Sequence, residues 1–486
     1  MRTSSDYLAK LKSMKPNVYL GGKKIEKIWE EPRIIPGINT ISLTYDLAND
    51  PQYDGLTTAT SHLTGEKINR FVHIHQSTDD LMKKVDMTRM FCRITGGCIQ
   101  RCMGIDGLNA VSVVTHEMDQ KLGTNYHPRF LEYLKFVQEN DMTLAGSMTD
   151  VKGDRNLRPH EQADPDMYVH VVERRADGIV IKGAKAHNTI APYSEELLVM
   201  PTRALTEADA DYAVCCAVPT DAPGVTLICT TAAPAGGRKL ERPASSKYCF
   251  VDSLTIFDNV FVPWERVFMC GEWQAAGLVA NYFATYHRHS YCGCKPATTD
   301  LLIGMAAQIA DYNGVEKASH VRDKITDMIM TGEMVYACGI AGSLKGQRRS
   351  SGTYYPDAVF VNSGKYHAGT NLHHEYETVQ DIAGGLCATM PSEESYFSPE
   401  IGPYMEKYLK GRADVTTEDR IRCFMLIEDY TVSRFGGVWA VAGIHGGGSP
   451  QAEKVAIIAN YDVEARKKMA RKLANIAEKD TRKTKA

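Results

Sequence analysis

The sequence lacks several features that would narrow its function at once. It contains no run of about eighteen apolar residues, and its first residues carry no apolar stretch of the signal-peptide kind. We therefore expect no membrane partner and no export, which leaves a cytoplasmic location. The formal net charge is only −3 at pH 7, so no positive excess points to nucleic acid. Internal repeats and low-complexity linkers are missing as well.

The length of the chain and its cysteine content are more informative. It has 486 residues, 43% of them hydrophobic and 24% charged, which predicts a globular protein of more than one domain. Its 13 Cys are expected to be reduced thiols or metal ligands, because disulfides belong mainly to exported proteins.

The period of the apolar residues divides the chain into three parts. Residues 1–143 show mostly helical spacing, and residues 144–270 change to the alternation of strands. Within the second part, Asp177-Gly178 between two apolar runs predicts a β-hairpin. Long helical runs return from residue 271 to 486. Several short strands at this spacing are typical of a compact barrel or a sandwich. We predict an α+β multidomain fold with an N-terminal mainly helical domain, a middle β-barrel domain and a C-terminal helical bundle.

Two distant segments carry residues that can bind a metal. Cys98 and Cys102 are four residues apart, so on a helix they would share one face on neighbouring turns. His287 and Cys294 lie nearly two hundred residues later and could complete a set of four ligands. Residue types leave the ion open, because three Cys and one His suit zinc as well as an iron–sulfur cluster. Wide separation in helix-like surroundings favours a buried cluster, and free core thiols are the alternative.

The order of helices, strands and helices, together with several short motifs, resembles the flavin-dependent acyl-CoA dehydrogenase-like superfamily. Within it the chain is most similar to the 4-hydroxybutyryl-CoA dehydratase family. The related 4-hydroxyphenylacetate 3-monooxygenase family shares the layout without the Cys/His set. The segments that carry the resemblance are Cys98–Cys102, Thr149–Arg155, His187–Thr189, His287–Lys295, Ala310–Gly314, Asp381–Gly385 and Met390–Glu393.

This resemblance implies a [4Fe-4S] cluster with three Cys ligands and one His ligand. Cys92 and Cys292 fall outside the family pattern, and we interpret them as packing thiols. On an unbroken helix His287 and Cys294 would lie about 10 Å apart along the axis. Either they bind opposite irons, or the helix breaks near Gly293. The implied ligands are Cys98, Cys102, His287 and Cys294.

The resemblance also implies FAD, laid on loops of the middle domain with Thr189 near the N5 edge of the ring. A Gly-Gly turn in the last domain would contact the dinucleotide of a neighbouring subunit, which implies a homotetramer. Glycine permits the close backbone approach that a pyrophosphate requires, although a helix-capping turn is the alternative. The predicted flavin residues are Thr149, Asp150, Lys152, Gly153, Asp154, Arg155, His187, Asn188 and Thr189, with Asp381, Ala383, Gly384 and Gly385 in the turn.

The implied activity is a radical dehydration of 4-hydroxybutyryl-CoA, or a related hydroxyacyl-CoA, to crotonyl-CoA, with vinylacetyl-CoA isomerisation. The C3 proton is not acidic until the enolate loses one electron, which a flavin can take and return. In this scheme His287 is a cluster ligand and, once displaced, a base. Tyr291 and Lys295 would hydrogen-bond the departing hydroxyl or the thioester, and Gln100 would orient the substrate. The alternative for each is support of the cluster, which itself suits low-oxygen conditions.

One position departs from the dehydratase pattern. Where those enzymes carry an acidic residue shortly before the equivalent of His445, this chain has Ala442. The nearby acids Glu428, Asp429 and Glu453 are possible replacements. The substrate therefore differs, or the reaction stops at isomerisation. Two other classes stay open: a two-component flavin monooxygenase without a cluster, and a zinc-stabilised binding module without flavin.

Overall fold

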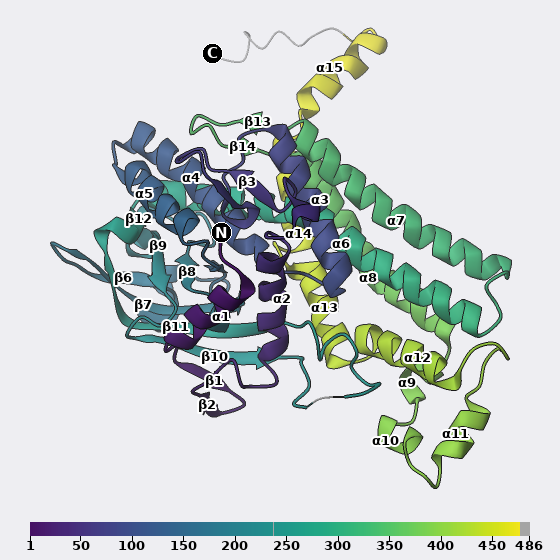
Figure 1. The fold of residues 1–486 in the computed structure, drawn as a ribbon. Helices are drawn as coiled ribbons and strands as arrows, with labels where there is room; N and C mark the ends of the chain where they lie inside the picture. The colour runs from purple at the N-terminus through teal and green to yellow at the C-terminus, as the bar shows by residue number, and fades with distance from the viewer. Residues whose placement is uncertain (237, 477–486) are drawn as a thin grey trace.

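The computed structural model describes residues 1–236 and 238–476. Its helical bundle stands beside two β-sheets, with the chain start between them (Figure 1). The N-terminal part is mostly helical, as predicted. Its elements are α1 (Ser4–Ser13), β1 (Val18–Leu20), β2 (Lys23–Ile25), α2 (Ile35–Asp46), β3 (Thr58–Thr60), β4 (Lys67–Asn69), α3 (Thr78–Thr95), α4 (Cys102–Leu122) and α5 (Tyr126–Glu139).

The middle strands form two open sheets, so the closed barrel that we predicted is wrong. One sheet has the order β2-β1-β10-β11-β7-β6, and the other has the order β12-β9-β8-β5. The larger sheet cannot close through β10, because β1 pairs with β10 in parallel and β2 extends the edge further. The strands are β5 (Leu144–Ser147), β6 (His170–Arg174), β7 (Gly178–Thr189), β8 (Glu196–Val199), β9 (Val214–Pro219), β10 (Val225–Thr231), β11 (Val251–Pro263) and β12 (Val267–Cys270).

Burial patterns show how the two sheets pack. Strand β8 is buried at every residue, whereas β11 alternates between buried and more exposed residues along most of its length. The smaller sheet is therefore covered on both faces, with α4 and α5 on one side and β7 of the larger sheet on the other. The predicted hairpin at Asp177-Gly178 is confirmed, since β6 and β7 pair antiparallel around it.

Helix α6 is the central helix of the C-terminal part. It runs unbroken for 40 residues despite Pro296. It packs against α7 and α8 of the bundle and against α3 and α4 of the N-terminal part (Figure 1). The elements here are α6 (Trp273–Tyr312), α7 (Ser319–Leu344), β13 (Gln347–Arg348), β14 (Tyr354–Tyr355), α8 (Ala358–Ala383), α9 (Leu386–Thr389), α10 (Glu393–Tyr396), α11 (Gly402–Tyr408), α12 (Thr417–Thr431), α13 (Arg434–His445), α14 (Pro450–Asn460) and α15 (Val463–Leu473).

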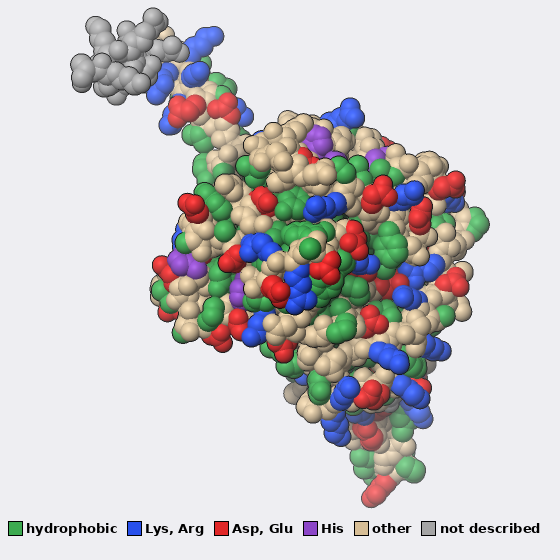
Figure 2. Space-filling view, turned by 90° about the vertical axis from the view of Figure 1, so that its left-hand side faces the viewer, with side chains coloured by type: hydrophobic (Ala, Val, Ile, Leu, Met, Phe, Trp, Pro, Cys, Tyr) green, Lys and Arg blue, Asp and Glu red, His purple; other side chains and the backbone are tan. Residues whose placement is uncertain are grey.

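The last described helix, α15, has no buried residue and projects from the body (Figure 2). No helix among the described residues is both long and apolar enough to cross a membrane. The order of the three parts agrees with the prediction, but the boundaries at residues 143 and 270 stay a prediction. The chain segments on either side of the first boundary are closely joined, since the β1–β2 hairpin belongs to the larger sheet.

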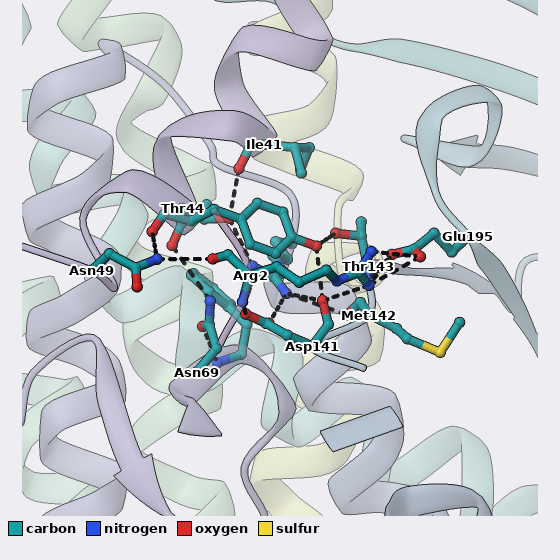
Figure 3. Close-up of polar contacts among 12 residues, drawn as sticks. Arg2, Ile41, Thr44, Asn49, Asn69, Asp141, Met142, Thr143 and Glu195 are labelled. Carbon is teal, nitrogen blue, oxygen red and sulfur yellow. Dashed lines mark hydrogen bonds and ion pairs between the residues drawn. The ribbon is translucent and has the colours of Figure 1, made fainter. Parts of the chain in front are cut away.

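A buried polar network ties the chain start to the beginning of α4 (Figure 3). The Arg2 guanidinium pairs with Glu195 at 2.8 Å and donates to the Asp141 carbonyl at 3.0 Å. The Asp141 carboxylate in turn accepts from the buried Arg101 at 2.7 Å. Because Arg101 directly precedes Cys102, this network fixes the residue that opens α4.

Candidate functional site

The first two predicted ligands do not share a helix face, which corrects our expectation. Cys98 lies in the loop after α3, and Cys102 is the first residue of α4. Gly96 ends α3 with a φ of 69°, and Gln100 also has a positive φ, of 62°. Left-handed residues reverse the chain direction, so the helix stops and the loop turns back before α4 begins.

The turn nevertheless brings all four predicted ligands together. The Cys98 thiol lies close enough to the thiols of Cys102 and Cys294 for each to shift the pKa of the other. A ring nitrogen of His287 and the sulfur of Cys102 lie within 4.8 Å of each other and of an Asp106 carboxylate oxygen. Helices α4 and α6 and the α3–α4 loop therefore supply one convergent set of three thiols and one imidazole.

The spacing of His287 and Cys294 is explained by an unbroken helix. Both lie on α6, so the predicted alternative of a break near Gly293 is wrong. Gly293 has a different use: a Cβ there would lie 2.4 Å from the Val85 carbonyl oxygen of α3. Only glycine lets α6 approach α3 this closely, and α3 leads directly into the loop of Cys98.

The pKa values of the three thiols are shifted in different directions. Hydrogen bonds from Cys102, Cys294 and the Gln100 N–H (3.3 Å) lower the pKa of Cys98 well below its ordinary value. The pKa of Cys102 and that of Cys294 are raised by their bonds to Cys98 and by burial. One thiolate thus forms readily, and its charge opposes ionisation of the other two. Three thiolates at this place need a bound cation to balance them.

The two cysteines outside the family pattern have different surroundings. Cys92 is fully buried in the same apolar cluster as the predicted Cys ligands, and burial followed by the charge of Cys98 raises its pKa. Cys292 faces α8 and lies 3.8 Å from the Val361 carbonyl oxygen. Cys292 is a packing thiol by its contacts, whereas Cys92 is a close neighbour of the ligand set.

Tyr291 and Lys295 connect α6 to the C-terminal half of α13. The Tyr291 hydroxyl donates to the Ala442 carbonyl at 2.6 Å. The Lys295 ammonium lies 5.9 Å from the ring centres of both Tyr291 and Trp439. A Cβ on Gly443 would lie 2.8 Å from that ammonium. Ala442, where the resemblance implies a missing carboxylate, is therefore next to both predicted catalytic side chains.

A narrow pocket lies beside the thiols and is lined by Cys98, Gln100 and Trp439 among others. Two polar atoms of its lining residues are buried without a partner in the described part of the chain: Gln100 Oε1 and Trp439 Nε1. A neighbouring cavity shares Cys249 and is lined by Asp252 and Arg434. Buried polar atoms without partners are costly, so the first cavity is suited to a ligand that offers both a donor and an acceptor.

The two predicted flavin segments of the middle part lie side by side. Thr149 accepts from the Ala186 N–H at 2.9 Å, and the Asp150 carboxylate pairs with Lys185 at 2.6 Å. Asn188 is buried, and its Oδ1 has no partner among the described residues. The exposed members of the set are Lys152, Gly153, Asp154, Arg155 and His187.

Thr189 joins this region to the second cavity. Its hydroxyl donates to the Asp252 carboxylate at 2.5 Å, across the paired ends of β7 and β11. Burial raises the pKa of Asp252 above its ordinary value, while the Thr189 hydrogen bond opposes that shift. Through Asp252 and the shared Cys249, the predicted flavin segments and the thiols border adjoining cavities.

The predicted Gly-Gly turn is not brought to this place. Helix α8 ends at Ala383, and Gly384 follows with a φ of 76° and exposed surroundings. Asp381 pairs with Lys324 of α7. The turn leads into α9, which lies against α12 below the helical bundle (Figure 1). Within one chain, Asp381 and Gly385 do not meet the other predicted flavin residues.

Sequence reasoning missed three residues that the structure places at the site: Asp106, Asp252 and Trp439. Asp106 had a usable signal, because it follows Cys102 by four residues on a helix and so shares its face. Asp252 and Trp439 carried no local signal, since each is brought to its cavity by pairing or packing between remote segments.

Comparison with known proteins assigns the family. A profile described as 4-hydroxyphenylacetate 3-hydroxylase N terminal matches residues 3–269, and the corresponding C-terminal profile matches residues 276–475. The chain belongs to the 4-hydroxyphenylacetate 3-hydroxylase family.

Within this family the chain is 43% identical to 4-hydroxybutyryl-CoA dehydratase/vinylacetyl-CoA-Delta-isomerase of Clostridium aminobutyricum, over 98% of this chain and 100% of that one. An oxygen-tolerant archaeal 4-hydroxybutyryl-CoA dehydratase from N. maritimus has a TM-score of 0.95 at 41% identity, over 98% of this chain and 96% of the other. The FAD complex of the oxygenase component of 4-hydroxyphenylacetate 3-monooxygenase has a TM-score of 0.87 at 26% identity, over 97% and 98%. These matches confirm the predicted resemblance and the prediction that the protein is an enzyme. The dehydratase/isomerase name of the relative agrees with a lyase that has isomerase activity.

Proposed function

We propose that this chain is a flavin- and [4Fe-4S]-dependent lyase acting on 4-hydroxybutyryl-CoA or a related hydroxyacyl-CoA. The product is crotonyl-CoA, and vinylacetyl-CoA isomerisation is its second activity. The observation that carries the proposal is the convergence of three thiols and His287 beside a cavity with unpaired polar atoms. Relatives with the dehydratase name support the reaction class.

The donor set fits an iron–sulfur cluster. Cys98, Cys102 and Cys294 are near one another, and burial together with mutual repulsion prevents all three from ionising unless a cation is present. A cluster supplies that positive charge, and thiolate with imidazole is a ligand set that such clusters use. The residues that would hold it are Cys98, Cys102, His287 and Cys294.

The middle part fits a flavin by a similar argument. Asn188 Oδ1 is a buried acceptor without a partner in the described chain, which suits a ligand that brings an N–H group. Thr149 and Asp150 flank it from the neighbouring loop. The related monooxygenase component binds FAD, as its structure is described. We assign the ring to this region, next to Asp252 and the adjoining cavities.

Once bound, the flavin supplies one-electron transfer and the cluster supplies a Lewis acid for the leaving hydroxyl. Side chains of the protein orient the substrate and transfer protons. Trp439 donates a hydrogen bond to the acyl group and Gln100 accepts one, which orients the substrate within the cavity. Lys295 donates to the thioester carbonyl or to the departing hydroxyl, and Tyr291 does so when its hydroxyl leaves the Ala442 carbonyl. Once displaced from the iron, His287 would accept the C3 proton, because a neutral imidazole is suited to that transfer near neutral pH.

Two further proposals concern the assembly. The chain forms a homotetramer in which the Asp381–Gly385 turn contacts the dinucleotide of a neighbouring subunit. Exposed apolar side chains on α7, among them Met330 and Met334, supply surface that such an assembly can cover. The cellular setting that we propose is a cytoplasm with little oxygen.

The deciding experiment starts from protein purified without oxygen. Iron, zinc and flavin are measured, and the protein is then incubated with 4-hydroxybutyryl-CoA and with vinylacetyl-CoA while crotonyl-CoA is followed. The expected result is iron with flavin and product from at least one substrate. Flavin without iron, together with hydroxylation of a phenol by reduced flavin, would make the chain a monooxygenase. Zinc without flavin would indicate the binding module.

Ala442 favours a second candidate within the same class, an isomerase with weak dehydration. The methyl group of Ala442 cannot transfer a proton, and two of the three nearby acids already bind other residues. Glu428 pairs with Arg242, and the buried Asp429 accepts from the Ser245 N–H at 2.9 Å. Glu453 is the acid that stays available: it pairs with Lys365 through Oε1, and its Oε2 has no partner in the described chain. The ratio of the two rates distinguishes the candidates.

A further inference from the structure

Asp106 is the centre of a buried polar cluster built from three helices. Its side chain is fully buried on α4. Lys84 of α3, itself fully buried, pairs with Oδ1 at 2.5 Å. Ser290 of α6 donates to both carboxylate oxygens, at 3.1 and 3.0 Å. The fourth contact joins Oδ2 to Nδ1 of His287 at 3.0 Å.

The bond to His287 determines which ring nitrogen carries the proton. A carboxylate paired with an ammonium can only accept hydrogen bonds, so Nδ1 must be the donor. The neutral imidazole then keeps its lone pair on Nε2. The ring is also held in place, stacked on Phe283 at 5.6 Å with an angle of 14° and edge-on to Tyr291 at 5.4 Å.

We propose that Asp106 is a positioning residue that fixes the His287 tautomer, so that Nε2 is the atom offered to the iron of the site. The inference rests on the proposed function, because it concerns the imidazole ligand of the cluster. Lys84 and Ser290 hold the carboxylate that holds the ring. A carboxylate behind a metal-bound imidazole is a recurrent arrangement, and its loss commonly costs about 10–100-fold in metal affinity or activity.

The substitution Asp106→Asn tests the idea with little change of shape. Lys84 cannot face an amide NH2, so the Asn oxygen must take the Lys84 side and the NH2 must face Nδ1. Nδ1 then becomes an acceptor, and the proton moves to Nε2, which can no longer bind iron. We expect iron to fall from about four to about three atoms per subunit. The electron paramagnetic resonance spectrum should change to that of a three-iron cluster.

Two matched variants distinguish an effect on the His287 tautomer from a general structural effect of losing a buried carboxylate. Asp209→Asn removes another buried carboxylate bonded to a histidine, His160 at 2.6 Å, away from the thiols, and should retain the wild-type iron content. In a His287→Cys background, Asp106→Asn should have no further effect on iron, because a thiolate ligand needs no tautomer. An equal loss of iron in that background, or full iron in the single Asp106→Asn variant, would overturn the proposal.

The wild-type protein decides the question if Asp106→Asn does not fold. Histidine labelled with ¹⁵N at Nδ1 alone is incorporated, and the nitrogen directly coupled to the reduced cluster is identified by electron–nuclear double resonance. Direct coupling to the unlabelled nitrogen supports the proposal, and direct coupling to ¹⁵N refutes it. Wild-type protein without iron, or without any coupled nitrogen, contradicts the proposed function or its ligand set instead.

Discussion

Gly293→Ala tests the contact on which the convergence of ligands depends. Gly293 is buried on α6, and a Cβ there would lie 2.4 Å from Val85 O and 3.0 Å from Thr88 Cβ, both on α3. No real Cβ approaches a backbone oxygen this closely, so α3 and α6 must separate by several tenths of an ångström. Forcing an extra carbon into such a packed contact costs about 1–3 kcal/mol.

The matched control lies on the same helix. Gly304 is exposed, and a Cβ there meets nothing within 4 Å. Gly304→Ala should therefore stabilise the protein by up to about 1 kcal/mol, the ordinary gain of alanine over glycine in a helix. The two substitutions are chemically identical and have opposite expected signs.

Thermal unfolding of the three proteins at one scan rate measures the difference, and iron analysis accompanies it. We expect Gly293→Ala to melt below wild type and Gly304→Ala at or above it. Gly293→Ala should also contain less iron, because separating α3 from α6 moves the loop of Cys98 away from Cys294. If Gly293→Ala melts as high as Gly304→Ala and retains full iron, the close approach of these helices is not what assembles the site.

The remaining predictions concern the thiols, a buried acid, the assembly and the missing carboxylate. Ala substitutions at Cys98, Cys102 or Cys294 should lower iron sharply, whereas those at Cys92 and Cys292 should not; loss of iron in Cys92→Ala would make it a ligand. Burial raises the pKa of Glu375 from an ordinary 4.5 to about 7, so the native state binds more protons than the unfolded state and loses stability as pH rises through this range. Glu375→Gln should thus stabilise the protein at pH 8 and change little near pH 4, which melting at both pH values checks. Sedimentation should show a tetramer; a monomer with full FAD would contradict it. Ala442→Glu should raise dehydration of 4-hydroxybutyryl-CoA by about 10²–10⁴-fold if a proton donor is missing, and Glu453→Gln should then matter less than in wild type.

The predicted ligand set came from the family resemblance, because residue types alone left a zinc site, a cluster and free core thiols open. Three Cys and one His in two short segments meet in the structure, although the local conformation around Cys98 was predicted wrongly. The signal for a helix end was present, since Gly96 and Gly97 directly precede Cys98. The prediction used only the four-residue spacing of the thiols and did not take these two glycines into account.

The sheets were not predictable in the same way, because their pairing is remote in sequence. Val18 of β1 pairs with Leu227 of β10, more than two hundred residues later. Short strands with alternating burial occur in barrels and in open sheets alike. Nothing in the local pattern says that the larger sheet gains an edge hairpin from the N-terminal part. The same reason hid Asp252, which reaches Thr189 only through the pairing of β11 with β7.

In the proposed cluster site, charge explains why the His287 imidazole and the Lys84 ammonium accompany the three thiols. Four thiolates around a buried cluster would add one more negative charge than three thiolates and a neutral imidazole. Asp106, which orients that imidazole, would restore the charge, but Lys84 pairs with it and cancels it. The site thus gains a fixed imidazole without gaining net negative charge. Under the proposed function, lower negative charge would make the iron a better Lewis acid, which is the property that a leaving hydroxyl requires.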